Sequence, residues 1–123
     1  MACDALGNPL PLFCLSGGQV HDSQRARAII RLYPARYWVA DRAYVDCKIR
    51  QQIESQGGAV VIQPKSNNKT RWVYDKFLYS SRHLIENCFQ RLKSLRRVAT
   101  RYEKLAIHYA GFVSLACVLD WLR

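Results

Sequence analysis

Acidic residues are scarce in this sequence. The chain of 123 residues has 9 Asp and Glu against 19 Lys and Arg, which gives a formal net charge of +10. This balance indicates a polyanionic partner, most often a nucleic acid and less often a membrane surface. The positive charge is concentrated between Lys65 and Lys104, where eleven basic residues occur with only three acids.

Paired cysteines, a leader segment and an uninterrupted apolar span are missing as well. The five cysteines are scattered without a CxxC pair, which suggests neither a disulfide framework nor a zinc site and fits a reducing compartment. The first residues lack the basic and apolar segments of a signal peptide. Polar residues interrupt the most apolar run, 105–122, so we expect a buried helix there and no membrane span. A cytoplasmic protein is expected.

No internal repeat, low-complexity segment or linker divides the chain. Half of its residues are hydrophobic, so one compact domain with a real core is expected over 1–123. Turn residues at 6–9, followed by an apolar run, predict a hairpin whose first strand is very short. A helix is expected over 26–33, with Asp22 or Ser23 as its N-cap. A functional role for His21 and Asp22 is the alternative.

Two short apolar runs, YWVA at 37–40 and AVVI at 59–62, predict buried strands of a parallel sheet. A helix is expected between them, from about 46 to 55, and the order strand, helix, strand implies a right-handed crossover. The predicted fold class is therefore α/β. Asp41 follows the first strand directly, and the carboxyl end of a parallel strand is a familiar position for a functional side chain.

The segment 64–78 combines basic and aromatic side chains in a predicted loop. This composition suits a nucleic-acid strand, with phosphates on the cations and bases on the rings. The alternative is an ordinary loop whose aromatic rings pack into the core. The residues concerned are Lys65, Lys69, Arg71 and Lys76, with Trp72, Tyr74 and Phe77.

The stretch YSSRHLIENCFQRLK at 79–93 has the pattern of an amphipathic helix. At about 100° per residue, four polar residues share a stripe roughly 60° wide, opposite a broad apolar face. They are Tyr79, Arg82, Glu86 and Lys93. A solvated helix face, with Arg82 and Glu86 as an i,i+4 ion pair, explains the stripe without a function.

Asp41 and Glu86 are the two acids in suggestive positions, one after a predicted strand and one on the helix that follows the next strand. In a compact fold with this order of elements, both could meet at the carboxyl edge of the sheet. Converging carboxylates beside phosphate-binding cations would hold a pair of divalent ions, which prefer oxygen ligands and serve phosphodiester cleavage. This convergence is a hypothesis.

The stripe also resembles the signature of a known family. Its spacing, Tyr79, two residues, Arg82, three residues, Glu86, six residues, Lys93, is similar to the Y-(2)-R-(3)-E-(6)-K signature of DDE transposases from bacterial insertion sequences of families four and five. ADRAY at 40–44 resembles the D-x-[GA]-[YF] motif around the second catalytic aspartate of that family. The resemblance runs nearly end to end, with further similar segments at 4–10, 17–22, 74–76 and 96–106.

The resemblance implies an RNase H-like catalytic core that uses two Mg²⁺ ions for hydrolytic nicking and strand transfer at transposon ends. Carried over to this chain, Asp41 would be the second metal-binding acid and Glu86 the third. Tyr79, Arg82 and Lys93 would lie along the transposon-end DNA and contact phosphate or a displaced base. A bacterial, nucleoid-associated protein that forms a homo-oligomer on DNA is the corresponding expectation.

The match departs from the family pattern at the N-terminus. In the family, the first catalytic aspartate lies on the first central strand, upstream of the segment that resembles residues 4–10, and Asp4 aligns with the hairpin turn. We therefore expect an RNase H-like core truncated at the N-terminus, without its first central strand and first metal ligand, and inactive alone. An upstream-frame N-terminal part, or decay of the gene, would account for the truncation.

Two other functions remain open from the sequence. A basic DNA-binding remnant without catalysis fits the net charge and the missing first aspartate. A generic α/β structural domain is the third possibility, and it requires the motifs to be coincidental.

Overall fold

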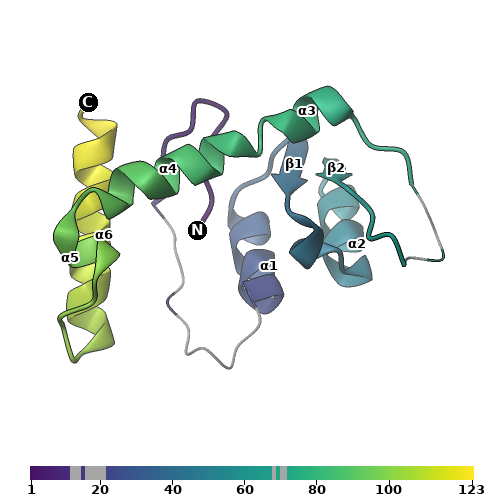
Figure 1. Ribbon diagram of the computed structural model, residues 1–123. Helices are drawn as coiled ribbons and strands as arrows, with labels where there is room; N and C mark the ends of the chain where they lie inside the picture. Colours follow the sequence, from purple (N-terminus) through teal and green to yellow (C-terminus); the bar gives the residue numbers. More distant parts are fainter. Residues whose placement is uncertain (12–14, 16–21, 68, 70–71) are drawn as a thin grey trace. The chain divides into compact units, whose positions relative to one another are not determined.

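Two compact units make up the computed structural model, which describes residues 1–11, 15, 22–67, 69 and 72–123 (Figure 1). The α/β unit is Gly18–Arg82, and the helical unit combines Met1–Gly17 with His83–Arg123. Each unit has its own cluster of buried hydrophobic side chains and is described by itself.

The α/β unit alternates helices and strands along the chain. A short 3₁₀ helix follows the first strand, and a short α-helix ends the unit. The bounds are α1 Asp22–Leu32, β1 Tyr37–Ala40, η1 Arg42–Tyr44, α2 Cys47–Ser55, β2 Ala59–Ile62 and α3 Lys76–Ser80. The predicted α/β class is confirmed, whereas the roles suggested for His21 and for the side chains of Asp22 and Ser23 fall outside the described residues.

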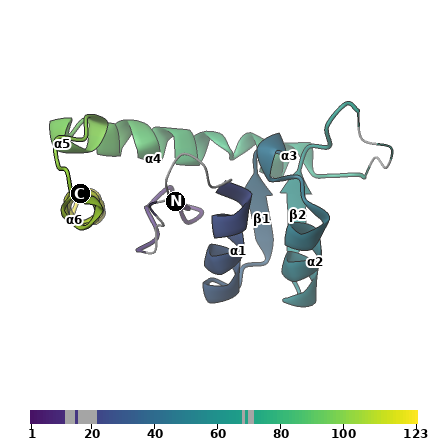
Figure 2. The ribbon, with the colours of Figure 1, turned by 90° about the horizontal axis from the view of Figure 1, so that it is seen from below.

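β1 and β2 form a two-stranded parallel sheet, in which the two strands lie side by side (Figures 1 and 2). The register pairs Ala40 with Ile62, so the carboxyl ends of both strands lie at one edge. The prediction of a fully buried strand is wrong for β1, because Tyr37 is 46% exposed and the other three residues are half-buried. Within the described residues no third strand pairs with β1 to shield its outer side.

Helices α1 and α2 contribute the buried side chains that pack against this sheet. Ile30 of α1 and Ile49 and Ile53 of α2 are buried together, and Trp38 and Val60 pack against them. Trp38 and Val60 are register partners, so they lie on the same face of the sheet. This apolar layer fixes the strands, and therefore their carboxyl edge, against both helices.

Local chemistry sets the ends of α2. The Asp46 carboxylate accepts a hydrogen bond from the Lys48 amide at 3.0 Å and caps the first turn. Gly57 has a φ of +78°, the left-handed conformation that commonly ends a helix. At Gly58 a Cβ atom would lie 2.7 Å from the carbonyl oxygen of Ala35, so a side chain does not fit. The helix predicted between the two strands is confirmed.

The helical unit contains α4 His83–Lys93, α5 Arg96–Ala99 and α6 Ala106–Trp121. Figure 2 shows α6 end-on while α4 runs across the view, so these two helices cross steeply. Near the N-terminus, Cys3 and Pro9 form an antiparallel bridge around a turn, which confirms the turn predicted at 6–9. Most of the predicted second hairpin strand falls outside the described residues.

The core of the helical unit lies between α4 and α6. Cys88 and Leu92 of α4 pack with Val113, Ala116 and Cys117 of α6. The expected buried helix over 105–122 is only partly confirmed, because α6 buries one side and leaves large apolar residues exposed on the others. These are Ile107, Leu115, Val118, Leu119 and Trp121. Within the described parts of the chain, no helix combines the length and apolarity that a membrane crossing requires.

The continuous helix expected over 79–93 is divided by a turn at Ser81 and Arg82. The amides of Ser81 and Arg82 each donate to the carbonyl three residues earlier at 3.1 Å, a tighter pattern than the α-helical one. The Ser80 hydroxyl donates to the carbonyl of Phe77 at 2.6 Å, and such local bonds compete with regular helix bonding. The Ser80 side chain therefore contributes a local reason for the break.

Candidate functional site

Asp41 lies directly after β1, at the carboxyl edge of the parallel sheet. Its Oδ1 accepts a hydrogen bond from the Arg42 amide at 2.6 Å and caps η1. Among the described residues this is the one hydrogen bond of the carboxylate, and the residue is exposed. The edge therefore presents a solvent-accessible carboxylate on a backbone position that the sheet holds in place.

A hydrogen bond joins the residues that follow the two strands. The Arg42 Nε donates to Oε1 of Gln63 at 3.0 Å, and Gln63 follows β2 directly. The edge thus carries three polar side chains: the Asp41 carboxylate and the Arg42 guanidinium after β1, and the Gln63 amide after β2. Sequence reasoning did not single out Arg42 or Gln63, although their positions immediately beyond the two strand ends were available as a signal.

Trp72 attaches the following loop to this edge. Its indole Nε1 donates to the carbonyl of Ile62, the last residue of β2, at 2.8 Å. The guanidinium of Arg50, on α2, lies 4.2 Å from the centroid of the ring and covers one of its faces through a cation–π contact. Trp72 is half-buried by these contacts, and its role in DNA binding stays a prediction.

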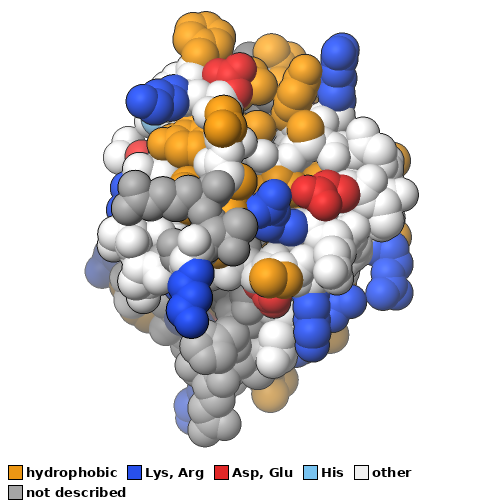
Figure 3. Space-filling view, turned by 90° about the vertical axis from the view of Figure 1, so that its right-hand side faces the viewer, with side chains coloured by type: hydrophobic (Ala, Val, Ile, Leu, Met, Phe, Trp, Pro, Cys, Tyr) orange, Lys and Arg blue, Asp and Glu red, His pale blue; other side chains and the backbone are white. Residues whose placement is uncertain are grey.

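The predicted DNA-binding cations of this loop face solvent where they are described. Lys65 and Lys69 are exposed, and Arg71 falls outside the described residues. On the face shown in Figure 3, Lys and Arg side chains are spread over the surface and acidic side chains are few. That face shows the excess of positive charge expected from the sequence.

The aromatic side chains near α3 take different environments. Tyr74 and Tyr79 pack edge to face with their ring centroids 5.4 Å apart, and both are half-buried. Phe77 is 82% exposed, so the alternative of aromatic rings that pack into the core is wrong for this residue. Tyr79 is therefore held by Tyr74 within the α/β unit.

The four residues of the 79–93 signature are divided between the units. Tyr79 on α3 and Arg82 in the turn belong to the α/β unit, whereas Glu86 and Lys93 on α4 belong to the helical unit. Glu86 and Lys93 are both exposed, and their spacing of about two turns puts them on one face of α4. Convergence of Glu86 with Asp41 stays a prediction, as does its pairing with Arg82.

Arg91 lies on the side of α4 opposite to Glu86 and Lys93 and bonds this helix to its neighbours. Its Nε and Nη2 donate to Oδ1 and Oδ2 of Asp120, on α6, at 2.9 and 2.8 Å, and Nη2 also donates to the carbonyl of Gly7 at 2.6 Å. These hydrogen bonds lower the pKa of Asp120, against the effect of its burial. Sequence reasoning missed this pair, which fixes the helix that carries Glu86 and Lys93.

Asp4 is committed to the N-terminal turn. Its Oδ1 accepts from the amides of Leu6 and Asn8, both at 2.9 Å, and its Oδ2 accepts from the Asn8 side chain at 3.1 Å. Burial raises the pKa of Asp4, but these hydrogen bonds together lower it below its ordinary value. The geometry agrees with the expectation that Asp4 serves the turn.

Most other carboxylates of known position also have structural partners. Asp46 and Asp75 cap α2 and α3, Glu54 pairs with Arg50, and Glu103 pairs with Arg97. Asp41 and Glu86 offer exposed carboxylate oxygens, which are hard ligands suited to Mg²⁺. In the described part of the chain, no group of three or more His, Cys, Asp or Glu is assembled for a metal ion. Asp41 and Glu86 each fit a divalent ion in the chemical type of their donor atoms.

Two comparisons with known proteins found similar sequences. The family described as transposase DDE domain matches residues 1–72, a range that includes Asp41. A putative transposase for insertion sequence element IS6501 from Brucella ovis is 35% identical over 121 residues, which cover 98% of this chain and 93% of the relative. No solved structure matches the chain.

Proposed function

The chain belongs to the family of transposase DDE domains, and on that premise we propose that it binds DNA and contributes two carboxylates, Asp41 and Glu86, to a divalent-metal site for DNA transposition. One observation carries the proposal. Asp41 has an exposed carboxylate immediately after a strand of a parallel sheet, with a guanidinium, Arg42, held beside it by Gln63.

Members of this family generally use divalent metal ions. Bound at these acids, two Mg²⁺ ions would activate a water or a 3′-hydroxyl and stabilise the leaving oxygen of a phosphodiester. Asp41 and Glu86 would act as oxygen ligands, and Arg42 would meet phosphate through its terminal nitrogens while its Nε stays on Gln63. An RNase H-like arrangement of the strands is the fold that this role implies.

The DNA would be held by cations and aromatic rings. Lys65, Lys69, Arg71, Arg82 and Lys93 would contact phosphates, whereas Tyr79 and Trp72 would contact bases. The exposure of Lys65, Lys69 and Lys93 supports this assignment, since a phosphate can reach them without rearrangement of the fold.

Catalysis would require a third carboxylate besides Asp41 and Glu86. Among the described side chains, six other carboxylates take part in a turn, in caps or in ion pairs. They are Asp4, Asp46, Glu54, Asp75, Glu103 and Asp120. We propose that residues 1–123 by themselves do not cleave DNA and that the remaining acid comes from outside these residues.

The test is mobility of a marked insertion element that encodes this chain. Asp41→Asn and Glu86→Gln should each lower transposition about a hundredfold or more, because an amide is a poor ligand for a hard cation. Glu54→Gln, which changes an exposed acid of α2 in the same way, should transpose as the wild type does. Transposition of Asp41→Asn at the wild-type frequency would refute the proposal.

A non-catalytic DNA-binding protein is the second candidate, and the net charge of +10 favours it. Binding of DNA by the purified chain is common to both candidates. The two candidates predict different effects of Asp41→Asn. Under the second candidate, this substitution changes neither DNA binding nor the frequency of transposition.

A further inference from the structure

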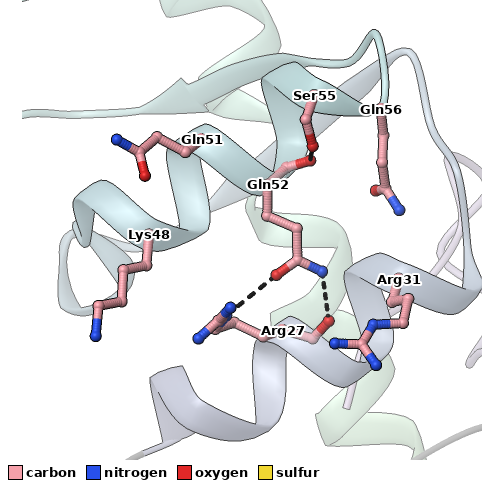
Figure 4. A pocket seen from close by; sticks show the side chains of 7 residues that line it. All are labelled: Arg27, Arg31, Lys48, Gln51, Gln52, Ser55 and Gln56. Carbon is pink, nitrogen blue, oxygen red and sulfur yellow. Dashed lines mark hydrogen bonds between the residues drawn. The ribbon is translucent and has the colours of Figure 1, made fainter.

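A cleft between α1 and α2 forms a second basic surface on the α/β unit. It has a volume of about 480 Å³ and is open to solvent along the two helices (Figure 4). Arg27 and Arg31 reach it from α1 and Lys48 from α2, with Gln52 between them. The remaining lining side chains are two glutamines and a serine, so no carboxylate lines the cleft.

The two ends of this cleft lie toward opposite edges of the sheet. Arg31 lies in the last turn of α1, and α1 ends just before β1 begins, so this end of the cleft lies toward the amino ends of the strands. Asp41 lies at the carboxyl end of β1. Lys48 lies in the first turn of α2, which follows η1, so the other end of the cleft lies toward the Asp41 edge, and the cleft runs along the helices from that edge toward the opposite one.

Helix stability does not explain these three cations together. Arg31 has a favourable place, since a positive charge in the last turn complements the helix dipole. Arg27 lies four residues before Arg31, and like charges at this spacing repel each other. Lys48 is in the first turn of α2, where a positive charge is unfavourable. A bound anion would relieve both of these unfavourable interactions.

Gln52 prepares Arg27 to bind such an anion. The Gln52 Oε1 accepts from Arg27 Nε at 3.2 Å, and the Gln52 Nε2 donates to the Arg27 carbonyl at 2.8 Å. This closed pair of hydrogen bonds fixes the guanidinium through Nε and does not use its two terminal nitrogens. A planar fork held in this way suits the oxygens of a phosphate.

The nearby acids do not neutralise the cleft. Glu54 points to Arg50 on the same helix, with 3.6 Å between the charged atoms, and Asp46 is engaged in the cap of α2. Within the described residues, Arg27, Arg31 and Lys48 take part in no ion pair shorter than 4.0 Å. Three cations therefore share one open cleft without a counter-charge among the side chains that the structure describes.

We propose that the α1–α2 cleft binds the phosphodiester backbone of duplex DNA, as a contact surface that extends from the Asp41 side of the sheet along the two helices. The inference rests on DNA being the partner, as the proposed function has it. An open cleft along two helices suits a continuous chain of phosphates, and contacts to phosphate alone carry no base preference. The DNA bound here is therefore held irrespective of its sequence.

The experiment measures binding of the full chain to a duplex of random sequence, in EDTA, as a function of salt concentration. The cleft variant is Arg31→Gln with Lys48→Gln. The matched control, Arg25→Gln with Arg36→Gln, removes the same charge from exposed residues of the same unit that do not line the cleft. Thermal unfolding of both variants checks that they are folded, and removal of repelling charges should leave the cleft variant at least as stable as the control.

The cleft variant should lose about 2 from the slope of log K against log salt, because each phosphate contact contributes about 0.9. Its affinity at about 0.1 M salt should fall on the order of tenfold or more, while the slope of the control changes by less than about 0.5. Equal slopes for the two variants would overturn the inference. This assay is done in EDTA and does not measure transposition, so the transposition experiment tests the proposed function and the salt slope tests the cleft independently.

Discussion

Arg91 and Asp120 form a two-point ion pair between α4 and α6, with Nε to Oδ1 at 2.9 Å and Nη2 to Oδ2 at 2.8 Å. The Asp120 side chain is only 4% exposed, and that of Arg91 is 31% exposed. The same guanidinium reaches the carbonyl of Gly7, and Trp121 Nε1 donates to the carbonyl of Pro9 at 2.7 Å. One ion pair and one indole therefore tie the N-terminal turn to both long helices of the helical unit.

Loss of this pair should destabilise the helical unit. Asp120→Asn keeps the shape of the side chain but leaves the partly buried guanidinium of Arg91 without a negative partner. We expect a loss of about 1–3 kcal/mol in the free energy of unfolding, below the range for fully buried pairs because Arg91 retains some contact with water. Urea unfolding followed by circular dichroism measures it.

Glu54→Gln is the control for the change of charge. It breaks the exposed pair of Glu54 with Arg50, whose charged atoms are 3.6 Å apart, and exposed pairs of this kind contribute roughly 0–1 kcal/mol. A loss for Asp120→Asn no larger than that for Glu54→Gln would contradict the structural role of the Arg91 pair.

Acid should unfold the wild type partly through Asp120. The hydrogen bonds from Arg91 hold the pKa of Asp120 in the folded chain below its ordinary value of about 3.9. Below about pH 4 the unfolded chain therefore binds more protons at this position than the folded chain, and stability falls as the pH falls. Asp4 has a lowered pKa as well and adds to the same loss.

The variant Asp120→Asn should accordingly show a shallower loss of stability between about pH 5 and about pH 3. Unfolding free energies measured across that range for wild type and variant test this. Parallel curves for the two proteins would mean that Asp120 titrates alike in the folded and unfolded chains.

Two glycine substitutions should have opposite effects. In Gly58→Ala, the new Cβ would lie 2.7 Å from the carbonyl oxygen of Ala35 and 3.0 Å from Cγ2 of Ile53, so overpacking should destabilise by about 1–3 kcal/mol. In Gly111→Ala, within α6, no neighbouring atom lies within 4 Å of the new Cβ, and the higher helix propensity of alanine should stabilise by up to about 1 kcal/mol. Thermal unfolding of both variants gives the signs, and a stabilised Gly58→Ala would contradict the packing before β2.

Trp72→Phe tests whether the indole N–H of Trp72 anchors the loop. Phenylalanine keeps a ring beside Arg50 but removes the indole N–H that donates to Ile62, so loop 64–75 should be cut faster in limited proteolysis, with a stability loss of about 1 kcal/mol. Tyr74→Phe, which removes a hydroxyl from the same loop, is the matched control. Equal rates of cleavage for the two variants would show that the Ile62 bond does not anchor the loop.

The α/β unit could largely be predicted from the sequence because its signals are local. Two short apolar runs, a capping acid at Asp46 and two glycines after Ser55 mark β1, α2 and β2 without reference to distant residues. Burial of β1 could not be predicted in the same way, since it depends on which strands lie beside it.

The helical unit was harder to predict because its determinants are tertiary or subtle. Periodicity over 79–93 describes the faces of the helix but not the hydrogen bond from Ser80 to Phe77 that accompanies the break before α4. Arg91 and Asp120 are 29 residues apart, and no spacing rule connects them. The exposed side of α6 likewise depends on what packs against the helix rather than on its apolar composition.

The central claim is that Asp41 and Glu86 bind divalent ions, and Fe²⁺-mediated cleavage of the polypeptide tests it most directly. With Fe²⁺ in place of Mg²⁺, ascorbate and peroxide should cut the DNA-bound chain near residue 41 and near residue 86, and excess Mg²⁺ should suppress both cuts. Asp41→Asn should lose both cuts together if, as proposed, the two acids are ligands of one site. Cuts at neither position, or loss of only the cut near residue 41 in this variant, would contradict the account.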